Sequence, residues 1–234
     1  MTDTKYLNFP IQLINGLFTN KEETLTNILY CGLYSHSLKL DLGEDDFDNF
    51  LSSVKFYNVS MSGSNYDKKN KFQTGMKIYN SISTASPKVG LNMDVFWDFY
   101  KNEKTEFDLA CLASFLAIKS ILGSKPYCKV TNAYLWARMN GNSSSIKDVS
   151  ELSEHIFKYA NVYQTVKIKN ELRDSWGLNT YSRYTRGFYV SYTLDLDALV
   201  FEAEKKRKST KEKQYKQLEK EALLKAMARL NKSQ

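Results

Sequence analysis

The segment FDLACLASFLAIKSILG, from Phe107 to Gly123, is the longest apolar run of the sequence and decides the fold. Apolar residues occupy both faces of a helix drawn over it, which is typical of a helix buried in a core. The run contains Asp108 and Lys119 and is shorter than the roughly 20 residues that a membrane span needs. It therefore predicts a core helix near Glu106–Leu122 in the second half of the chain.

The sequence before this run predicts a helix-rich region over residues 1–87. YLNFPI predicts a short strand, the apolar spacing in KEETLTNILYCGLYSHSLKL predicts an amphipathic helix, and DLGEDDFDNFLSSVKFY predicts a second helix with acidic residues at its start. The polar segment Ser60–Lys71 predicts a loop, and Gln73–Ser83 a short helix. We place a domain boundary near Pro87.

The sequence after the run predicts three more helical segments and a hairpin. Lys125-Pro126 enforces a break, and Thr131 is a suitable N-cap for the helix NAYLWARM. Helical patterns follow in DVSELSEHIFKYA and in VYQTVKIKNELRDSW, which stops at Trp176-Gly177. NTYSRYT and RGFYVSY then have the Tyr, Thr, Val and Phe content of a β-hairpin around Arg183 and Arg186.

This order of elements resembles the winged-helix DNA-binding modules of plasmid and phage replication or regulatory proteins. The resemblance covers roughly residues 105–195 and implies a winged-helix-like domain over residues 88–195. The sequence departs from the pattern in two places: Asn142–Lys147 is a polar insertion where the family has a tight turn, and there is one helix too many.

Residues 196–234 follow as a basic amphipathic helix with neither Gly nor Pro. The predicted fold class is thus mainly α with a small β component, consisting of a helical N-terminal half, a winged-helix-like second half and a long basic C-terminal helix.

Charge is distributed unevenly along the chain. The net charge is +7, yet residues 1–160 balance with 17 Lys/Arg against 17 Asp/Glu, whereas residues 161–234 have 16 against 9. This asymmetry indicates an acidic partner, with nucleic acid first and a membrane surface second. The lysine run KKRKSTKEK has no bulky apolar residues opposite its cations, so we expect double-stranded DNA and no membrane.

A recognition helix needs side chains that reach base edges or phosphates on its solvent face. We expect Lys167, Lys169 and Arg173 to supply the cations, with Gln164 and Asn170 available for base edges, and the hairpin arginines to grip phosphate or the minor groove. The predicted DNA-binding residues are Gln164, Lys167, Lys169, Asn170, Arg173, Arg183, Arg186, Lys205, Lys206, Arg207 and Lys208. The alternative is that these residues bind nothing and are solvated charges on an ordinary helix and strand.

No catalytic motif is present, so we expect no enzyme, cofactor or metal. Phosphate-loop, dinucleotide and serine-hydrolase motifs are missing from the sequence, and three widely spaced cysteines with two distant histidines do not indicate zinc. The acidic cluster from Asp41 to Asp48 is typical of a helix start rather than of a Mg²⁺ site. A tyrosine nucleophile that cleaves DNA would need several Arg or His side chains beside it. Tyr181 and Tyr184 lie near Arg183 and Arg186 in the sequence, but aromatic residues of strands usually pack or stack, so we do not expect this chemistry.

Two functions from different classes fit these observations. The first is a cytoplasmic, non-enzymatic DNA-binding protein of a phage or mobile element, acting in replication or transcription control. The alternative is a structural or scaffolding protein, which could be viral, whose basic helical tail docks on an acidic partner. The N-terminal half would serve in oligomerisation or partner binding, so a homo-oligomer is one of the expected partners.

Overall fold

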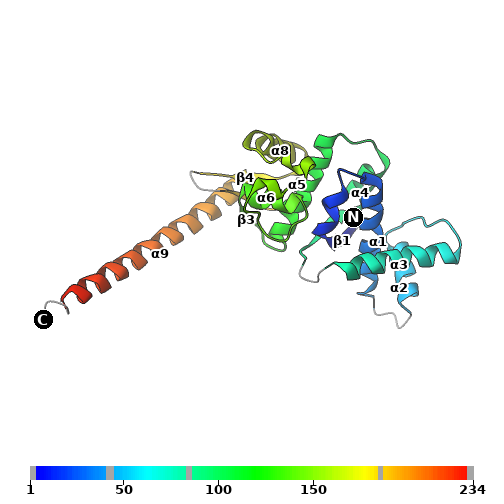
Figure 1. Cartoon of the computed structure of the whole chain (residues 1–234), viewed down its shortest axis with the longest axis horizontal. Helices are drawn as coiled ribbons and strands as arrows, with labels where there is room; N and C mark the ends of the chain where they lie inside the picture. Colours follow the sequence, from blue (N-terminus) through cyan, green and yellow to red (C-terminus); the bar gives the residue numbers. More distant parts are fainter. Residues whose placement is uncertain (1–3, 41–44, 83–85, 184–186, 231–234) are drawn as a thin grey trace.

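The computed structural model describes residues 4–40, 45–82, 86–183 and 187–230, with side chains described as far as residue 224. It is mainly helical with two small sheets, which confirms the predicted class, mainly α with a small β component. A folded body contains most of the elements, and the final helix projects from it as a single rod (Figure 1).

The described residues before Pro87 form one strand, a 3-10 helix and three α-helices. The strand pairs antiparallel with a strand that follows Pro87, so that Leu7 opposes Leu91 and Phe9 opposes Val89, with all four side chains buried. One continuous set of buried side chains extends from this two-stranded sheet into the second half of the chain. The elements are β1 (Tyr6–Pro10), η1 (Ile11–Gly16), α1 (Lys21–Ser37), α2 (Asp46–Phe56), α3 (Asn65–Ser81) and β2 (Lys88–Asn92).

Helix α3 corrects the loop predicted over Ser60–Lys71. It begins at Asn65 because Ser64 and Asp67 form a capping box, in which each side chain accepts a hydrogen bond from the other residue's backbone N–H. Gly75 is the one buried residue of this helix, and a Cβ there would lie about 2.5 Å from the Tyr30 carbonyl oxygen of α1. The helix therefore docks by close backbone approach at Gly75 together with Phe72 and Tyr79, which pack against the core, whereas its first turns, NYDKKNK, are polar and give no apolar periodicity.

The second half is built around α5, as the apolar run predicts. Ten of the 17 residues of α5 are buried, and the helix contacts α6, α8, β2 and β3. The elements are α4 (Met93–Lys101), α5 (Glu106–Leu122), β3 (Cys128–Val130), α6 (Asn132–Met139), η2 (Val149–Glu151), α7 (Glu154–Phe157), α8 (Val162–Trp176), β4 (Asn179–Tyr181), β5 (Phe188–Ser191) and α9 (Leu196–Leu230).

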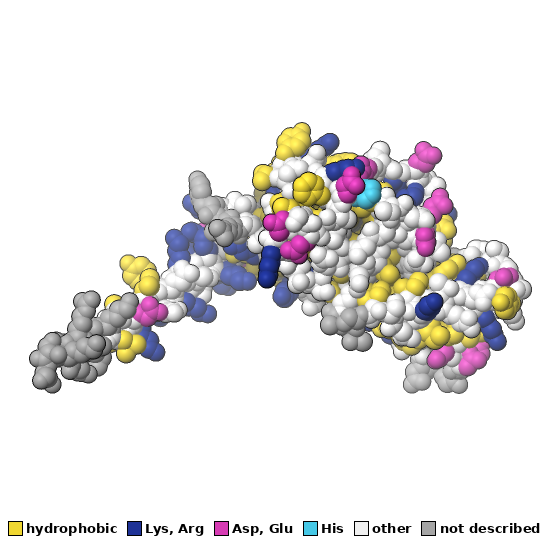
Figure 2. All heavy atoms as spheres, in the orientation of Figure 1, with side chains coloured by type: hydrophobic (Ala, Val, Ile, Leu, Met, Phe, Trp, Pro, Cys, Tyr) yellow, Lys and Arg dark blue, Asp and Glu magenta, His cyan; other side chains and the backbone are white. Residues whose placement is uncertain are grey.

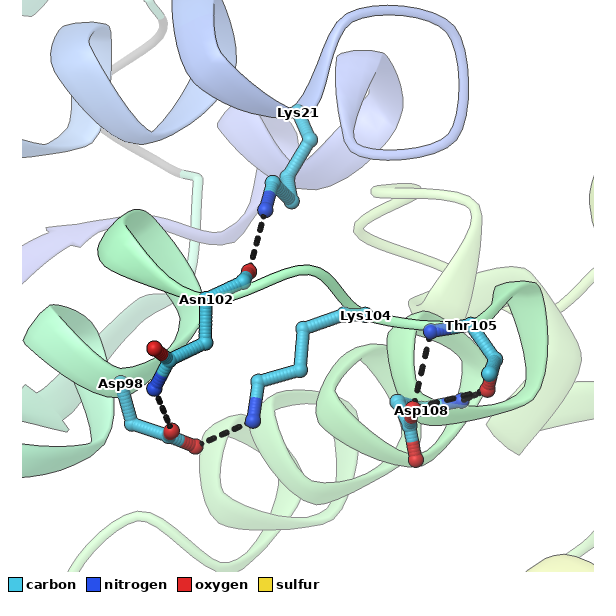
Figure 3. A network of polar contacts seen from close by, with 6 residues as sticks. All are labelled: Lys21, Asp98, Asn102, Lys104, Thr105 and Asp108. Carbon is cyan, nitrogen blue, oxygen red and sulfur yellow. Dashed lines mark hydrogen bonds and ion pairs between the residues drawn. The ribbon is translucent and has the colours of Figure 1, made fainter.

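A network of polar contacts fixes the start of α5 (Figure 3). Asp98 accepts hydrogen bonds from Asn102 at 2.7 Å and from Lys104 at 2.6 Å, and Lys21 donates to the Asn102 carbonyl at 2.8 Å. Thr105 and Asp108 then form the capping box that begins the helix. The connection between α4 and α5 is thus tied both to itself and to the first residue of α1.

The predictions for the ends and extents of the helices in the second half differ in outcome. Thr131 caps α6 and Gly177, in the left-handed region with φ 69°, ends α8, as predicted. The helical region predicted over DVSELSEHIFKYA is wrong in extent, since it forms only η2 and the four-residue α7. Leu152 between them is extended, and the Ser153 N–H donates to the Asn140 side chain at 3.0 Å instead of continuing a helix.

The hairpin predicted after Gly177 forms the larger sheet, with strand order β3-β5-β4. The register places Val130 opposite Phe188 on the face that joins the core. Because side chains alternate between the faces of a sheet, Lys129, Tyr189 and Tyr181 form one row on the outer face. The first turns of α9 cross this outer face, where Leu199 and Ala203 are buried.

Candidate nucleic-acid interface

Helix α8 exposes a mixed polar and apolar stripe. Thr165, Ile168 and Leu172 are buried, which directs the opposite side of the helix to solvent. That side contains Tyr163, exposed at 74%, Val166, exposed at 44%, and the exposed Asn170 and Arg173. Arg173 pairs with its neighbour Asp174 at 2.9 Å, an exposed ion pair of the kind that contributes little to stability. Gln164 lies half-buried in the first turn, where its N–H donates to the N-cap Asn161.

The two lysines predicted on this helix project to different sides. The Lys167 ammonium lies 4.5 Å from the centre of the Phe107 ring at the start of α5. The Lys169 ammonium lies 4.3 Å from the centre of the Phe188 ring on β5, and burial lowers the pKa of Lys169. Both are placed by cation–π contacts, so their ammonium groups flank the exposed stripe on opposite edges.

The hairpin cations are placed with α9. Arg183 is exposed, and its Nη1 lies 4.0 Å from Glu204 of α9. The Glu204 carboxylate also accepts hydrogen bonds from the Tyr181 hydroxyl at 2.8 Å and forms an ion pair with Arg207 at 2.7 Å. The hydrogen bond from Tyr181, followed by that from Arg207, lowers the pKa of Glu204. Arg186 and Tyr184 lie outside the described residues.

The four consecutive cations of α9 spread around the helix, as their spacing requires. Lys205, Lys206 and Lys208 are exposed, whereas Arg207 turns toward Glu204 and the sheet. Figure 2 shows Lys and Arg side chains gathered where α9 leaves the body. The predicted residues thus form two groups: the flanks of α8, and the base of α9 together with Arg183.

A cleft of about 380 Å³ lies between the outer face of the sheet and α9. Sequence reasoning missed most of its lining, because the row Lys129, Tyr189 and Tyr181 exists only once the strand register is known. Among the described residues, four cations and a single carboxylate line this cleft, and two of the cations, Arg207 and Lys211, come from α9.

Residues weighed for other chemistry have structural roles where they are described. Asp45 caps α2 by accepting the Asp48 N–H at 2.8 Å, as expected for a helix start, while Asp41 and Glu44 lie outside the described residues. Cys31 and Cys111 are buried thiols, and burial raises the pKa of each to about 12. Within the described ranges, no three His, Cys, Asp or Glu side chains are grouped as a metal site would need.

Comparison with protein-family models, with curated proteins and with solved structures finds no match for this chain. None of the helices in the part that the structure describes combines the length and apolar character of a membrane span.

Proposed function

We propose that this chain is a DNA-binding protein whose second half contacts duplex DNA through α8 and the hairpin that follows it. The observation that carries the proposal is the succession α5, β3, α6, α8, β4 and β5, interrupted only by η2 and the four-residue α7 between α6 and α8, in which β3, β5 and β4 form one sheet. Helices followed directly by a hairpin are the feature on which the resemblance to winged-helix modules rests. The proposal includes a role in replication or transcription control of a phage or mobile element, and it assigns no reaction to the chain.

The side chains on the exposed stripe of α8 suit the major groove. Asn170 has the donor and acceptor that read adenine, and Val166 offers a methyl surface to thymine. Arg173 would exchange an exposed, weak ion pair with Asp174 for a phosphate or a guanine. Lys167 and Lys169, at the two edges of the stripe, would meet the phosphates on either side of the groove.

Duplex binding measured over a salt series tests the proposal. Affinity should fall log-linearly with salt concentration, because each neutralised phosphate releases counterions. Asn170→Ala should weaken binding to a selected duplex by about tenfold, the value expected for one lost base contact, and leave binding to random duplexes unchanged. Asn70→Ala is the matched control, since Asn70 is an exposed asparagine on α3. Equal losses on both duplexes would contradict base reading by α8.

One observation favours the alternative function, a scaffold whose tail docks on an acidic partner. Between Lys208 and Leu224 every side chain of α9 is exposed, including Tyr215 at 79% and Leu218 at 63%. Apolar side chains exposed on a projecting helix are typical of an assembly surface. Sedimentation should then reveal a homo-oligomer or complex that Leu218→Asp abolishes, with little affinity for duplex DNA.

A further inference from the structure

The cleft between the three-stranded sheet and α9 is lined by aromatic and cationic side chains from four different elements or their ends. Two tyrosines from adjacent strands, Tyr181 and Tyr189, lie in its wall, and neither is fully exposed. Four cations surround them: Lys129 from β3, Arg183 beside β4, and Arg207 and Lys211 from α9. Its volume of about 380 Å³ falls in the range of roughly 300–1,000 Å³ that small-molecule sites occupy.

The charge of the cleft is not neutralised from within. Among the described lining residues Glu204 is the one carboxylate, and this group is already engaged by Tyr181 and Arg207. Lys129 and Lys211 make no ion pair among the residues that the structure describes. The arrangement holds one arginine in place and leaves the lysines available to an anion from outside.

We propose that this cleft binds an unpaired nucleotide, with an aromatic base against Tyr189 and a phosphate among Lys129, Arg183 and Lys211. Aromatic rings on a sheet face stack on bases, and a basic groove follows the phosphates of a single strand. A duplex fits the cleft poorly, because its base faces are covered by neighbouring bases and α9 crosses the same face of the sheet. The proposal goes beyond duplex binding by α8 and does not depend on it.

A base and a phosphate could reach this cleft in two forms, as a free nucleotide or as part of a single strand of nucleic acid. One binding experiment separates the two forms. Anisotropy of a labelled oligothymidylate measures the strand, and competition by thymidine monophosphate and by adenosine triphosphate measures the free nucleotide. Displacement at micromolar mononucleotide would assign the site to a free nucleotide, whereas strand binding without displacement would assign it to single-stranded nucleic acid. Failure of both ligands to bind would overturn the proposal.

Variants of the cleft test where the ligand lies. Tyr189→Leu should weaken binding about tenfold, as expected when one base loses its stacking partner, whereas Tyr189→Phe keeps the ring and should keep the affinity. Lys211→Gln should weaken binding several-fold and reduce the salt slope by about one. Lys216→Gln makes the same change farther along α9, outside the cleft lining, and should have no effect.

Three results would overturn the cleft as the site, and one would separate it from the function proposed for α8. Unchanged affinity in Tyr189→Leu, unchanged affinity in Lys211→Gln, or equal losses in Lys211→Gln and Lys216→Gln would each exclude it. Lys211 is an exposed residue of a projecting helix, so its variant folds even if the Tyr189 variant does not. Asn170→Ala should leave oligothymidylate binding intact, so this site can stand if duplex binding fails.

Discussion

Helices α5 and α9 both lack Gly and Pro, yet they occupy opposite environments. Ten of the 17 residues of α5 are buried, whereas the 35-residue α9 buries Leu199 and Ala203 near its start and exposes every side chain from Lys208 to Leu224. Tertiary packing therefore stabilises α5, while the outer part of α9 depends on local helix propensity, which is marginal for a helix alone in water. The body is specified by burial, and the projecting helix is available for a partner.

The largest expected effect tests this difference with one substitution made twice. Leu116→Asp places a carboxylate in α5 at a position exposed to only 1% and should cost several kcal/mol, enough to unfold the body. Leu218→Asp makes the same change at a position exposed to 63% and should alter stability by less than about 0.5 kcal/mol. Urea unfolding monitored by tryptophan fluorescence measures both. A Leu116 variant that melts with the wild type would show that α5 is not the core.

The second prediction locates the point at which α9 stops being part of the body. Leu199 is fully buried against the sheet, so Leu199→Ala should cost about 2–3 kcal/mol of docking free energy. Amide exchange over residues 196–204 should accelerate by about 30- to 150-fold, while that of α5 stays slow. Leu223→Ala, at a position exposed to 63%, is the control and should leave exchange of both helices unchanged. Equal acceleration in α5 would mean that the two helices unfold together.

The sequence predicts the parts of the fold whose signals are local, and it does not predict the parts that depend on contacts between distant segments. The periodic or fully apolar segments, with caps such as Thr131 and stops such as Gly177, predict their helices, because those signals are local. The β1–β2 pairing joins residues about 80 positions apart, and no local signal predicts it. For the same reason the row Lys129, Tyr189 and Tyr181 could not be predicted, since it depends on the register of three strands.

The sequence identified the cations of the candidate interface, but it did not predict which of them lie together in the structure. The base of α9 is basic in sequence, but which cations meet is decided by Glu204, which draws Arg207 to itself and lies near Arg183. On α8 the rings of Phe107 and Phe188 place the two lysines apart. The start of helix α3 was not predicted, although a local signal was present. Ser64 and Asp67 have the spacing of a capping box within a segment that otherwise lacks pattern.

The third prediction concerns the charge at the base of α9. Changing Lys205, Lys206, Arg207 and Lys208 together to Gln should weaken binding to every duplex by about 10- to 100-fold and lower the salt slope by about three to four. Sequence preference should not change, because cations spread around a helix cannot all read one groove. Stability should stay within about 1 kcal/mol, since three of the four side chains are exposed. A changed preference would place this segment in a groove, and no loss of affinity would favour the scaffold.

The smallest expected effect concerns pH and the connection that begins α5. The hydrogen bond from Lys104, followed by that from Asn102, lowers the pKa of Asp98 below its ordinary value near 3.8. The contribution of Asp98 to stability is therefore present above about pH 4 and is lost as the pH falls through its lowered pKa in the folded state. Asp98→Asn should be slightly less stable than the wild type at pH 7, and this difference should vanish near pH 2. Glu221→Gln, an exposed change on α9, should leave the acid unfolding curve unmoved. If the stability gap of Asp98→Asn stayed constant from pH 7 to pH 2, the carboxylate would contribute by shape rather than by charge, and the ion pair would not help to hold α5 in place.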